Sequence, residues 1–353
     1  NLLTEFVSSL NFERGRFSHS HYPNDRFGHF DNRIEFCKLD MSFLPFVSVI
    51  VPIYNGETDL PALLASLTAQ TYPNFECLLI DNNSHDRTAE LLEAAESERI
   101  RSLTQSQIQS AYAARNLGIQ NATGEILAFT DADCRPEPNW LKDLIQPFID
   151  STVGLVAGEI KAFPGQSLLE QYADRQETLS QKHTLNHPFC AYGQTANLAI
   201  RSEALKQVGL FRPYLTTGGD ADICWRILRE TSWQLRFAET AIVHHRHRTT
   251  LHELQSQWRR YGRSNRYLHE LHGIDLMRDP NFGEYRYRLL RWMLKELPLA
   301  FLNLIRGKAD LVDLIHTPIG LLCLRARAEG QQQAQLPTEA YTIESLSIPA
   351  SRT

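Results

Sequence analysis

Two carboxylates stand one residue apart where an apolar segment ends, and their spacing suits a hard divalent cation. Glu125–Thr130 has the composition of a buried strand, and Asp131 and Asp133 follow it. Residues i and i+2 of an extended chain point the same way, so both carboxylates can face one ion, directly or through water. Mg²⁺ or Mn²⁺ accepts such ligands and keeps positions open for phosphate oxygens. A solvated acidic loop would show the same residues, so this pattern alone leaves both interpretations open.

The bulk composition excludes several classes of protein. The chain has 353 residues, of which 42% are hydrophobic and 22% charged, as in a globular protein with a core. A net charge of −5 disfavours a general nucleic-acid binder, so we expect no nucleic-acid partner. The six cysteines lack Cys-x-x-Cys spacing, which disfavours a zinc or disulfide framework and suits the reducing cytoplasm.

Strands and helices are expected to alternate from residue 46 onward. Phe46–Pro52 and Phe75–Asp81 are apolar runs typical of strands buried on both faces. Asp86 is placed to cap a helix, and another helix is expected from about Ser110 to Gln120. The alternation predicts an α/β fold with a mostly parallel sheet, in which ligands bind at the carboxyl ends of strands. Three acids lie at such ends: Asp81, Asp131 and Asp133.

Three further segments carry polar residues in positions that could bind a ligand. The turn Asp81–Thr88 begins with a carboxylate that can accept from a base or a ribose hydroxyl. Ala114–Gly118 places the cation of Arg115 and the amide of Asn116 on one helix. The segment Gly218–Arg226 starts a helix with two acids behind a flexible glycine pair.

These segments, in this order, resemble the family 2 inverting glycosyltransferases, which have the GT-A fold. The resemblance covers roughly residues 46–265. The segments that match the family's motifs are Val47–Asn55, Asp81–Thr88, Ala114–Gly118, Asp131–Asp133, Gly193–Arg201, Asp220–Arg226, His245–Arg248 and Gln257–Gly262. The chain departs from the family at Gly219, where Glu often precedes the catalytic Asp.

The resemblance implies roles for individual residues. Asp220 matches the general base that takes the proton of the acceptor hydroxyl. Asp131, Asp133 and His245 match the residues around a divalent metal, Mn²⁺ or Mg²⁺. The residues expected at the donor nucleotide and its diphosphate are Pro52, Tyr54, Asn55, Glu57, Asp81, Asn82, Arg115, Asn116, Asp131 and Arg260.

The function expected from this resemblance is metal-dependent transfer of a sugar with inversion. The donor is a nucleotide-diphosphate sugar, with UDP favoured, and the acceptor is a saccharide or a lipid-linked glycan in polysaccharide or glycolipid biosynthesis. One alternative is a catalytically inactive nucleotide-sugar-binding subunit of a glycan assembly complex. Another is a nucleotidyltransferase, which the absence of Lys and Arg from Tyr54–Glu57 disfavours.

Several residues beside the proposed site residues could have a structural role in place of a functional one. Asp222 is expected as an acid favoured by the helix dipole, and Arg226 as an ion-pair partner. Trp225 can either stack on an acceptor or pack in the core. His244 should point away from the site if His245 points into it, because neighbours on a strand alternate.

The region after residue 250 is expected to be helical and apolar. Leu289–Lys295, Leu297–Ile305, Leu311–Ile315 and Ile319–Leu324 are apolar runs flanked by Arg and Lys, and Pro298 and Pro318 are expected to break them. The recurring charges disfavour a spanning helix, so we expect either packing on the catalytic domain or peripheral contact with an anionic membrane at its cytoplasmic face.

The expected domain organisation has four parts. Residues 1–45 form a disordered or non-native tail, with Met41 as the natural start and an ordered arm as the alternative. Residues 46–250 form the catalytic domain, with a nucleotide-binding half (46–133) and an acceptor half (134–250). A helical region (251–328) and a polar tail (329–353) follow, and a single helix is expected over Ser167–Lys182.

Overall fold

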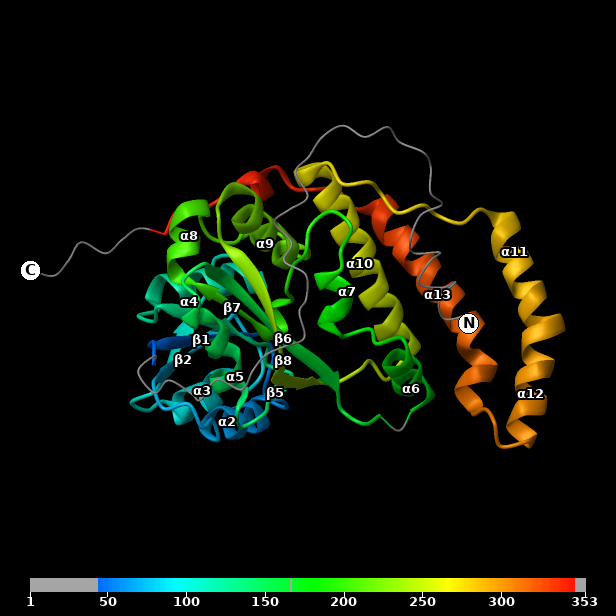
Figure 1. Cartoon of the computed structure of the whole chain (residues 1–353), viewed down its shortest axis with the longest axis horizontal. Coiled ribbons are helices and arrows are strands. Elements are labelled where there is room, and N and C mark those ends of the chain that lie inside the picture. The colour runs from blue at the N-terminus through cyan, green and yellow to red at the C-terminus, as the bar shows by residue number, and fades with distance from the viewer. Residues whose placement is uncertain (1–43, 166, 347–353) are drawn as a thin grey trace, which may run out of the picture. The chain divides into compact units, whose positions relative to one another are not determined.

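The computed structural model describes residues 44–165 and 167–346, which belong to one compact unit (Figure 1). The expected N-terminal tail and the start at Met41 therefore lie outside the described residues, except for Leu44 and Pro45. The first half alternates strands and helices: β1 (Val47–Ile53), α2 (Leu60–Thr68), β2 (Phe75–Asp81), α3 (Thr88–Ala95), β3 (Ile100–Thr104), α4 (Ala111–Asn121), β4 (Ile126–Phe129), β5 (Cys134–Pro136) and α5 (Trp140–Ile145).

The remaining elements complete the sheet and then become all-helical. The elements up to the last strand are the 3-10 helix η1 (Gln146–Ile149), β6 (Val153–Ala162), α6 (Leu168–Arg175), α7 (Gln181–Leu185), the 3-10 helix η2 (Thr195–Asn197), β7 (Leu198–Arg201), α8 (Ser202–Val208), α9 (Gly219–Glu230) and β8 (Gln234–His245). The C-terminal elements are α10 (Leu251–His272), α11 (Phe282–Arg291), a π-helical turn (Trp292–Glu296), α12 (Leu297–Ile305), α13 (Leu311–Gln333) and a 3-10 helix (Thr338–Tyr341).

One eight-stranded sheet organises the described residues, with the order β3-β2-β1-β4-β7-β6-β8-β5. The strands β3, β2, β1 and β4 are parallel, as are β6 and β8, while β7 runs antiparallel to both of its neighbours and β5 antiparallel to β8. Parallel pairings therefore predominate, and the prediction of an α/β fold with a mostly parallel sheet is confirmed.

The register of the strands determines which residues meet at the carboxyl edge. Ile53, the last residue of β1, pairs with Asp81, the last residue of β2. At the far end of the sheet, Cys134 of β5 pairs with His245, the last residue of β8. The second pairing places His245 beside the Asp131–Asp133 loop, although the two segments are far apart in the chain.

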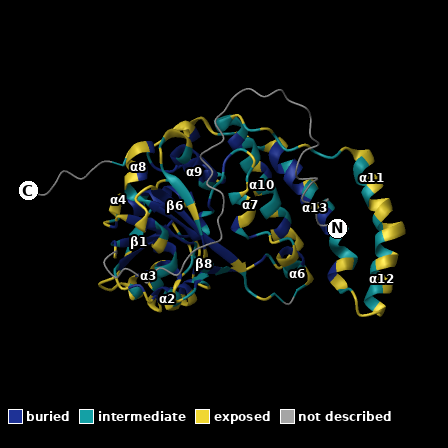
Figure 2. Cartoon of the chain, viewed as in Figure 1, coloured by how far each residue is buried: buried dark blue, intermediate teal, exposed yellow. Residues whose placement is uncertain are grey.

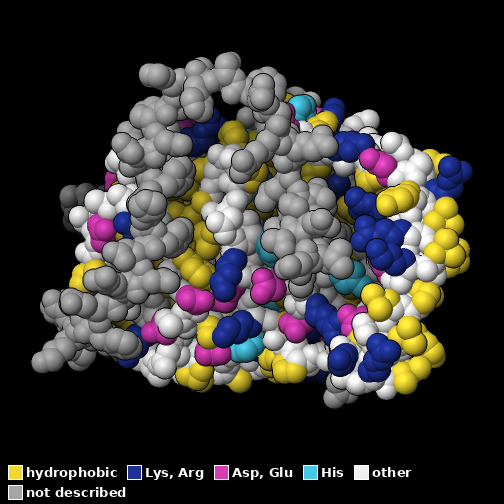
Figure 3. All heavy atoms as spheres, turned by 45° about the vertical axis from the view of Figure 1, so that its right-hand side comes forward, with side chains coloured by type: hydrophobic (Ala, Val, Ile, Leu, Met, Phe, Trp, Pro, Cys, Tyr) yellow, Lys and Arg dark blue, Asp and Glu magenta, His cyan; other side chains and the backbone are white. Residues whose placement is uncertain are grey.

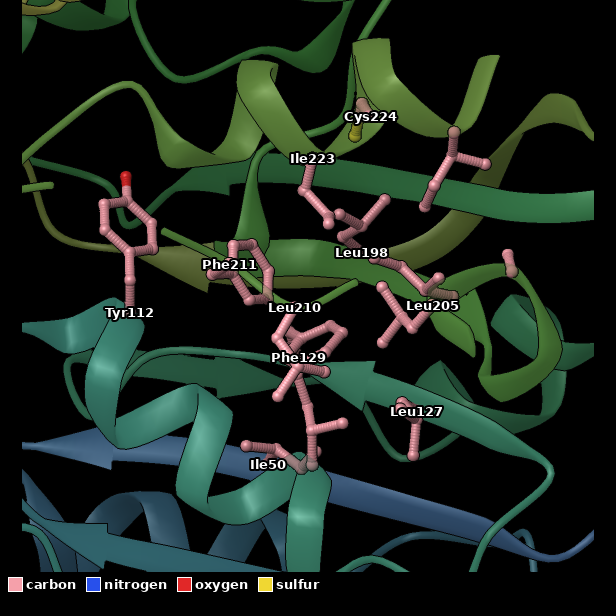
Figure 4. Close-up of a cluster of buried hydrophobic side chains, with 14 of the residues drawn as sticks. Ile50, Tyr112, Leu127, Phe129, Leu198, Leu205, Leu210, Phe211, Ile223 and Cys224 are labelled. Atoms are coloured by element: carbon pink, nitrogen blue, oxygen red, sulfur yellow. The ribbon is translucent and has the colours of Figure 1, made fainter. Parts of the chain in front are cut away.

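The core lies where α4, α8 and α9 meet the sheet, and β1 and β2 are buried along their whole length. Phe211 packs edge-on against Phe129, with ring centroids 5.7 Å apart, and stacks on Tyr112 at 5.6 Å (Figure 4). This packing joins the helix that carries Arg115 to the loop that precedes α9.

Helix α10 lies against α13 at a contact that requires glycine. A Cβ atom on Gly262 would lie 1.9 Å from the carbonyl oxygen of Arg327, and one on Gly330 would lie 2.0 Å from that of Arg259. Because neither site has room for a side chain, the two backbones approach more closely than larger residues allow. The C-terminal helices are therefore tied to α10, the helix that carries Arg260.

Several local predictions were wrong. Pro318 lies inside α13 and does not end it, and Pro298 lies in the first turn of α12, which continues directly from the π-helical turn. Residues 167–182 form two short helices, α6 and α7, and do not form one.

The C-terminal tail also differs from its expected course. Helix α13 continues to Gln333, past the expected start of the tail at residue 329. The segment that follows packs on the core, where Ala340 is fully buried and Glu344 accepts a hydrogen bond from the backbone N–H of Leu210. Within the described ranges, no helix combines the length and apolar content needed to cross a membrane.

Candidate active site

Asp133 and His245 lie together and could hold a metal ion. Their Oδ2 and Nε2 atoms lie 3.2 Å apart, because β5 and β8 pair at this point. Nδ1 of His245 lies 2.8 Å from the carbonyl oxygen of Arg246, so an Nδ1–H bond there leaves Nε2 facing Asp133. A carboxylate and a ring nitrogen at this spacing fit a divalent cation that accepts oxygen and nitrogen ligands.

Asp133 and His245 shift each other's pKa in opposite directions. Burial would raise the pKa of Asp133, but the hydrogen bond and charge of His245 outweigh it and lower that pKa to about 2. Burial would lower the pKa of His245, and Asp133 raises it instead. The thiol of Cys134 lies within 4.8 Å of both ligating atoms, but burial raises its pKa well above the ordinary value, so it remains a neutral thiol.

Asp131 faces the buried cation of Arg115. Nη2 of Arg115 donates to Oδ1 of Asp131 at 2.5 Å, and the guanidinium lies 5.5 Å from the ring centroid of Tyr112. Nε of Arg115 is buried and has no hydrogen-bond partner among residues 44–346. A buried donor without a partner is uncommon and indicates a place where a ligand oxygen can bind.

Asp220 lies in the first turn of α9, and the charges of Arg115 and Asp131 act on it. Gly218 caps the helix with a φ of 82°, which a side chain would strain. Oδ1 of Asp220 accepts from the Thr195 hydroxyl at 3.0 Å, and Oδ2 accepts from the Thr195 backbone N–H at 3.3 Å. Burial raises the pKa of Asp220; Arg115 opposes this and Asp131 adds to it.

The turn after β2 brings the expected nucleoside-binding residues together. Oδ1 of Asp81 accepts from the backbone N–H of Ser84 at 3.0 Å. In the same turn, the backbone N–H of His85 donates to Oδ1 of Asn55. Tyr54 is exposed and meets the ring of His85 edge-on. Glu57 accepts from the backbone N–H of Arg87 at 3.0 Å.

Three of the residues expected to bind the donor have few groups free to do so. The amide of Asn116 exchanges two hydrogen bonds with the backbone of Phe211, and the amide nitrogen of Asn82 donates to Gln105 and Ile108. Pro52 is buried within β1. These three residues hold the loops in place and offer few free polar groups to a ligand.

Arg260 is an exposed residue of α10. Its charge acts on Tyr112, whose pKa burial raises and Arg260 lowers. The same arginine lowers the pKa of Tyr261 against the effect of burial. The positive charge of Arg260 therefore acts on Tyr112 and Tyr261, which belong to α4 and α10.

The neighbouring residues whose roles were open are structural. Asp222 is completely buried and paired with Arg212 and Arg226. Trp225 is also buried and donates to the carbonyl oxygen of Cys190, so it packs in the core. His244 lies 2.9 Å from Glu137 on the face opposite His245, as the alternation predicted.

Two residues of the site were missed by the sequence reasoning. Thr195 donates to Asp220, and the Tyr112 hydroxyl accepts from the backbone N–H of Gly219 at 3.0 Å. Thr195 lies within the matched segment Gly193–Arg201, which was the available signal. Tyr112 stands three residues before Arg115, on the same helix face, and that spacing could have indicated it.

Comparisons with known proteins identify the family to which the chain belongs. The family model described as glycosyl transferase family 2 matches residues 48–209. The chain is 33% identical over 223 residues to glycosyltransferase AglE of Haloferax volcanii, covering 62% of this chain and 72% of that protein. It is 31% identical over 137 residues to UDP-Glc:alpha-D-GlcNAc-diphosphoundecaprenol beta-1,3-glucosyltransferase WfgD of Escherichia coli, covering 38% of this chain and 54% of that protein.

Among solved structures, the chain is similar to mannosyltransferase PcManGT from Pyrobaculum calidifontis in complex with GDP-Man and Mn²⁺. The TM-score is 0.45 and the identity 20%, with 85% of this chain and 79% of the other covered. The family model and the relative from Haloferax volcanii together identify the family. This chain is therefore a glycosyltransferase with a GT-A type fold and belongs to glycosyl transferase family 2.

Proposed function

We propose that this glycosyltransferase moves a sugar from a nucleotide-diphosphate donor to an acceptor hydroxyl with inversion, with Asp220 as the general base and a divalent metal at Asp133 and His245. The observation that carries the proposal is the position of Asp220. It is a partly buried carboxylate in the first turn of α9, within electrostatic range of Arg115 and Asp131, and Asp131 acts in turn on His245.

The environment of Asp220 suits a base. Its two hydrogen bonds from Thr195 orient the carboxylate and leave lone pairs free, because an ionised carboxylate can accept about four bonds. Burial raises its pKa, which brings its proton affinity closer to that needed near neutral pH. In an inverting reaction, the base takes the acceptor proton while the hydroxyl attacks the sugar carbon opposite the leaving group.

The charged residues of the site indicate how the donor would bind. Asp81 would accept from the nucleoside, and Arg115 and Arg260 would face the diphosphate. A divalent cation bound at Asp133 and His245 would neutralise the charge that develops on the leaving diphosphate. Asp131 would reach the ribose or a ligand of the metal, while its bond to Arg115 holds both side chains in place.

The donor and acceptor classes are inferred from the relatives. WfgD is named for a UDP-glucose donor and a diphosphoundecaprenol-linked acceptor. We infer a UDP-sugar donor and a saccharide or lipid-linked acceptor for this chain, in polysaccharide or glycolipid biosynthesis. A lipid-linked acceptor would be met at the cytoplasmic face of the cell membrane.

A donor screen tests the proposal. The protein is incubated with single nucleotide sugars, and nucleotide release is measured with Mn²⁺, with Mg²⁺ and with EDTA. We expect release from a UDP-sugar with either metal and none in EDTA. The configuration at the transferred sugar carbon, read by NMR on the product, should be inverted relative to the donor.

The Asp133→Ala variant tests the metal ligands directly. It should lose transfer and should also lose Mn²⁺ binding in calorimetry, while Asp275→Ala, a change at an exposed acid, should affect neither. Full activity in EDTA, undiminished turnover of Asp133→Ala or a product of retained configuration would each contradict the proposal.

A further inference from the structure

Helices α11 and α12, with the π-helical turn between them, form a rod with two different faces. The inner face contacts α13: Nε1 of Trp292 donates to the carbonyl oxygen of Leu314 at 3.0 Å, and the Thr317 hydroxyl donates to Glu296 at 2.6 Å. None of the residues from Phe282 to Ile305 is buried. The rod is therefore attached to the molecule along one side only.

The outer face is apolar and open to solvent. The exposed large apolar residues of the rod are Phe282, Tyr287, Leu289, Leu290, Met293, Leu294, Leu299, Phe301, Leu302 and Ile305. Phe282, Leu294 and Ile305 are 81%, 74% and 70% exposed, so most of the surface of each of these residues is open to solvent. Figure 2 shows exposed residues recurring along both helices. Soluble monomers rarely leave an apolar surface of this extent without a partner.

Positive charge borders this surface. Residues 282–308 hold six basic and two acidic residues, a net charge of +4 in a chain whose net charge is −5. Figure 3 shows Lys and Arg side chains next to the hydrophobic ones on the right-hand side of the molecule. Both acids are paired, Glu284 with Arg278 and Glu296 with Arg291.

The other cations of this border are Arg286, Arg288, Lys295, Arg306 and Lys308. None of them has an acidic partner within 4 Å among the residues that the structure describes. Their charge is therefore available to an anionic partner outside the chain.

We infer that the outer face of α11 and α12 lies on an anionic membrane surface. An amphipathic helix binds such a surface by placing its apolar side at the level of the lipid headgroups, while Lys and Arg contact anionic lipid. Both components are present along the same rod. A second copy of the chain fits less well, because two surfaces of like charge would repel when brought face to face.

The attachment of the rod connects this surface to the active site. Helix α13 holds the inner face of the rod, and Gly262 and Gly330 hold α13 against α10. Helix α10 carries Arg260, the residue proposed above to bind the diphosphate. Membrane binding would thus hold the catalytic domain at the surface where a lipid-linked acceptor is presented. The binding itself does not depend on the proposed reaction.

Vesicle flotation of the whole chain tests the inference without reading activity. We expect the protein to float with phosphatidylcholine vesicles that contain about 30% phosphatidylglycerol, and to float much less with pure phosphatidylcholine. Raising the salt concentration should weaken flotation, because screening reduces the attraction of the exposed cations.

A triple variant, Leu294→Gln, Phe301→Gln and Ile305→Gln, removes three exposed apolar side chains of the outer face. Its partitioning onto anionic vesicles should fall at least about tenfold, because binding scales with the apolar area inserted. The control is Ile149→Gln, which alters an exposed apolar residue outside the rod and should float like the wild type. Thermal unfolding should show that both variants remain folded.

Three results would overturn the inference. The first is a wild-type protein that stays at the bottom with both vesicle types at low salt. The second is a triple variant that floats as well as the wild type. The third is self-association that the triple substitution abolishes, in the absence of flotation, because this would assign the surface to a second copy of the chain.

Discussion

Asp222 anchors α9, and its removal tests how the fold holds Asp220, the proposed base. The Asp222 carboxylate is completely buried; Oδ1 accepts from Arg212 at 3.0 Å and from His272 at 2.9 Å, and Oδ2 accepts from Arg226 at 3.1 Å. Asp222→Asn keeps the shape but leaves two guanidinium groups without their counter-charge. Breaking a buried ion pair from one side costs about 3–5 kcal/mol, and we expect a loss of that size.

The pH dependence of this loss follows from the pKa of Asp222. Burial would raise that pKa, but the bond with His272 and the charges of Arg226 and Arg212 lower it from 3.8 to about 2. Such a depressed pKa contributes stability that is complete above the unfolded value and is lost as the pH falls toward the folded value. The difference between 3.8 and about 2 corresponds to about 2 kcal/mol.

Urea unfolding of wild type and Asp222→Asn between about pH 6 and pH 3 measures this contribution. The difference in stability between the two proteins should narrow by about 1 kcal/mol over that interval, because Asp222 takes up a proton in the unfolded chain while it stays mostly ionised in the folded protein. Glu203→Gln, which breaks an exposed pair with Lys206, is the control and should change stability by less than about 1 kcal/mol. A gap that stays constant with pH, or a loss no larger than that of the control, would refute the assigned role of Asp222.

Two further predictions concern the supports of the site. Gly262→Ala should destabilise the protein by about 1–3 kcal/mol and weaken donor binding, because its Cβ would meet the Arg327 carbonyl 1.9 Å away and displace α10. Gly320→Ala in α13, where the nearest atom lies at 3.4 Å, should be tolerated in the same thermal and donor-titration assays. Thr195→Val removes a hydrogen bond that favours ionised Asp220, so the pKa of Asp220 should rise and the acid limb of the rate profile should move to higher pH. Thr195→Ser keeps the hydroxyl and should leave that profile in place, whereas equal profiles for both variants would argue against the bond.

The parallel half of the sheet was predictable because its signals are local. Val47–Ile53 and Phe75–Asp81 are apolar on both faces, and such runs form buried parallel strands wherever helices cover them. The positions of Asp81 and Asp131 at strand ends followed directly. The resemblance of the later segments to the family then indicated Asp220 and His245 as candidate site residues.

Other features depend on contacts between distant segments. The pairing of Cys134 with His245 cannot be seen in either segment alone, and neither can the bond between Thr195 and Asp220. Pro318 was expected to end a helix, but α13 is held on both sides by α10 and α6, and this packing outweighs the missing backbone hydrogen bond. Asn116 lies in a segment that matches a family motif, but its amide nitrogen donates to the backbone carbonyl oxygen of Phe211.

The central claim is that Asp220 is the base of the transfer reaction, and the Asp220→Asn variant tests it most directly. The measurement is the single-turnover rate of sugar transfer with saturating donor and metal, beside the dissociation constant of the donor. The account predicts a rate at least about 10²-fold below that of the wild type, with donor affinity unchanged, because the amide keeps the shape of the carboxylate but cannot accept the proton. A variant that transfers sugar at the wild-type rate would contradict it.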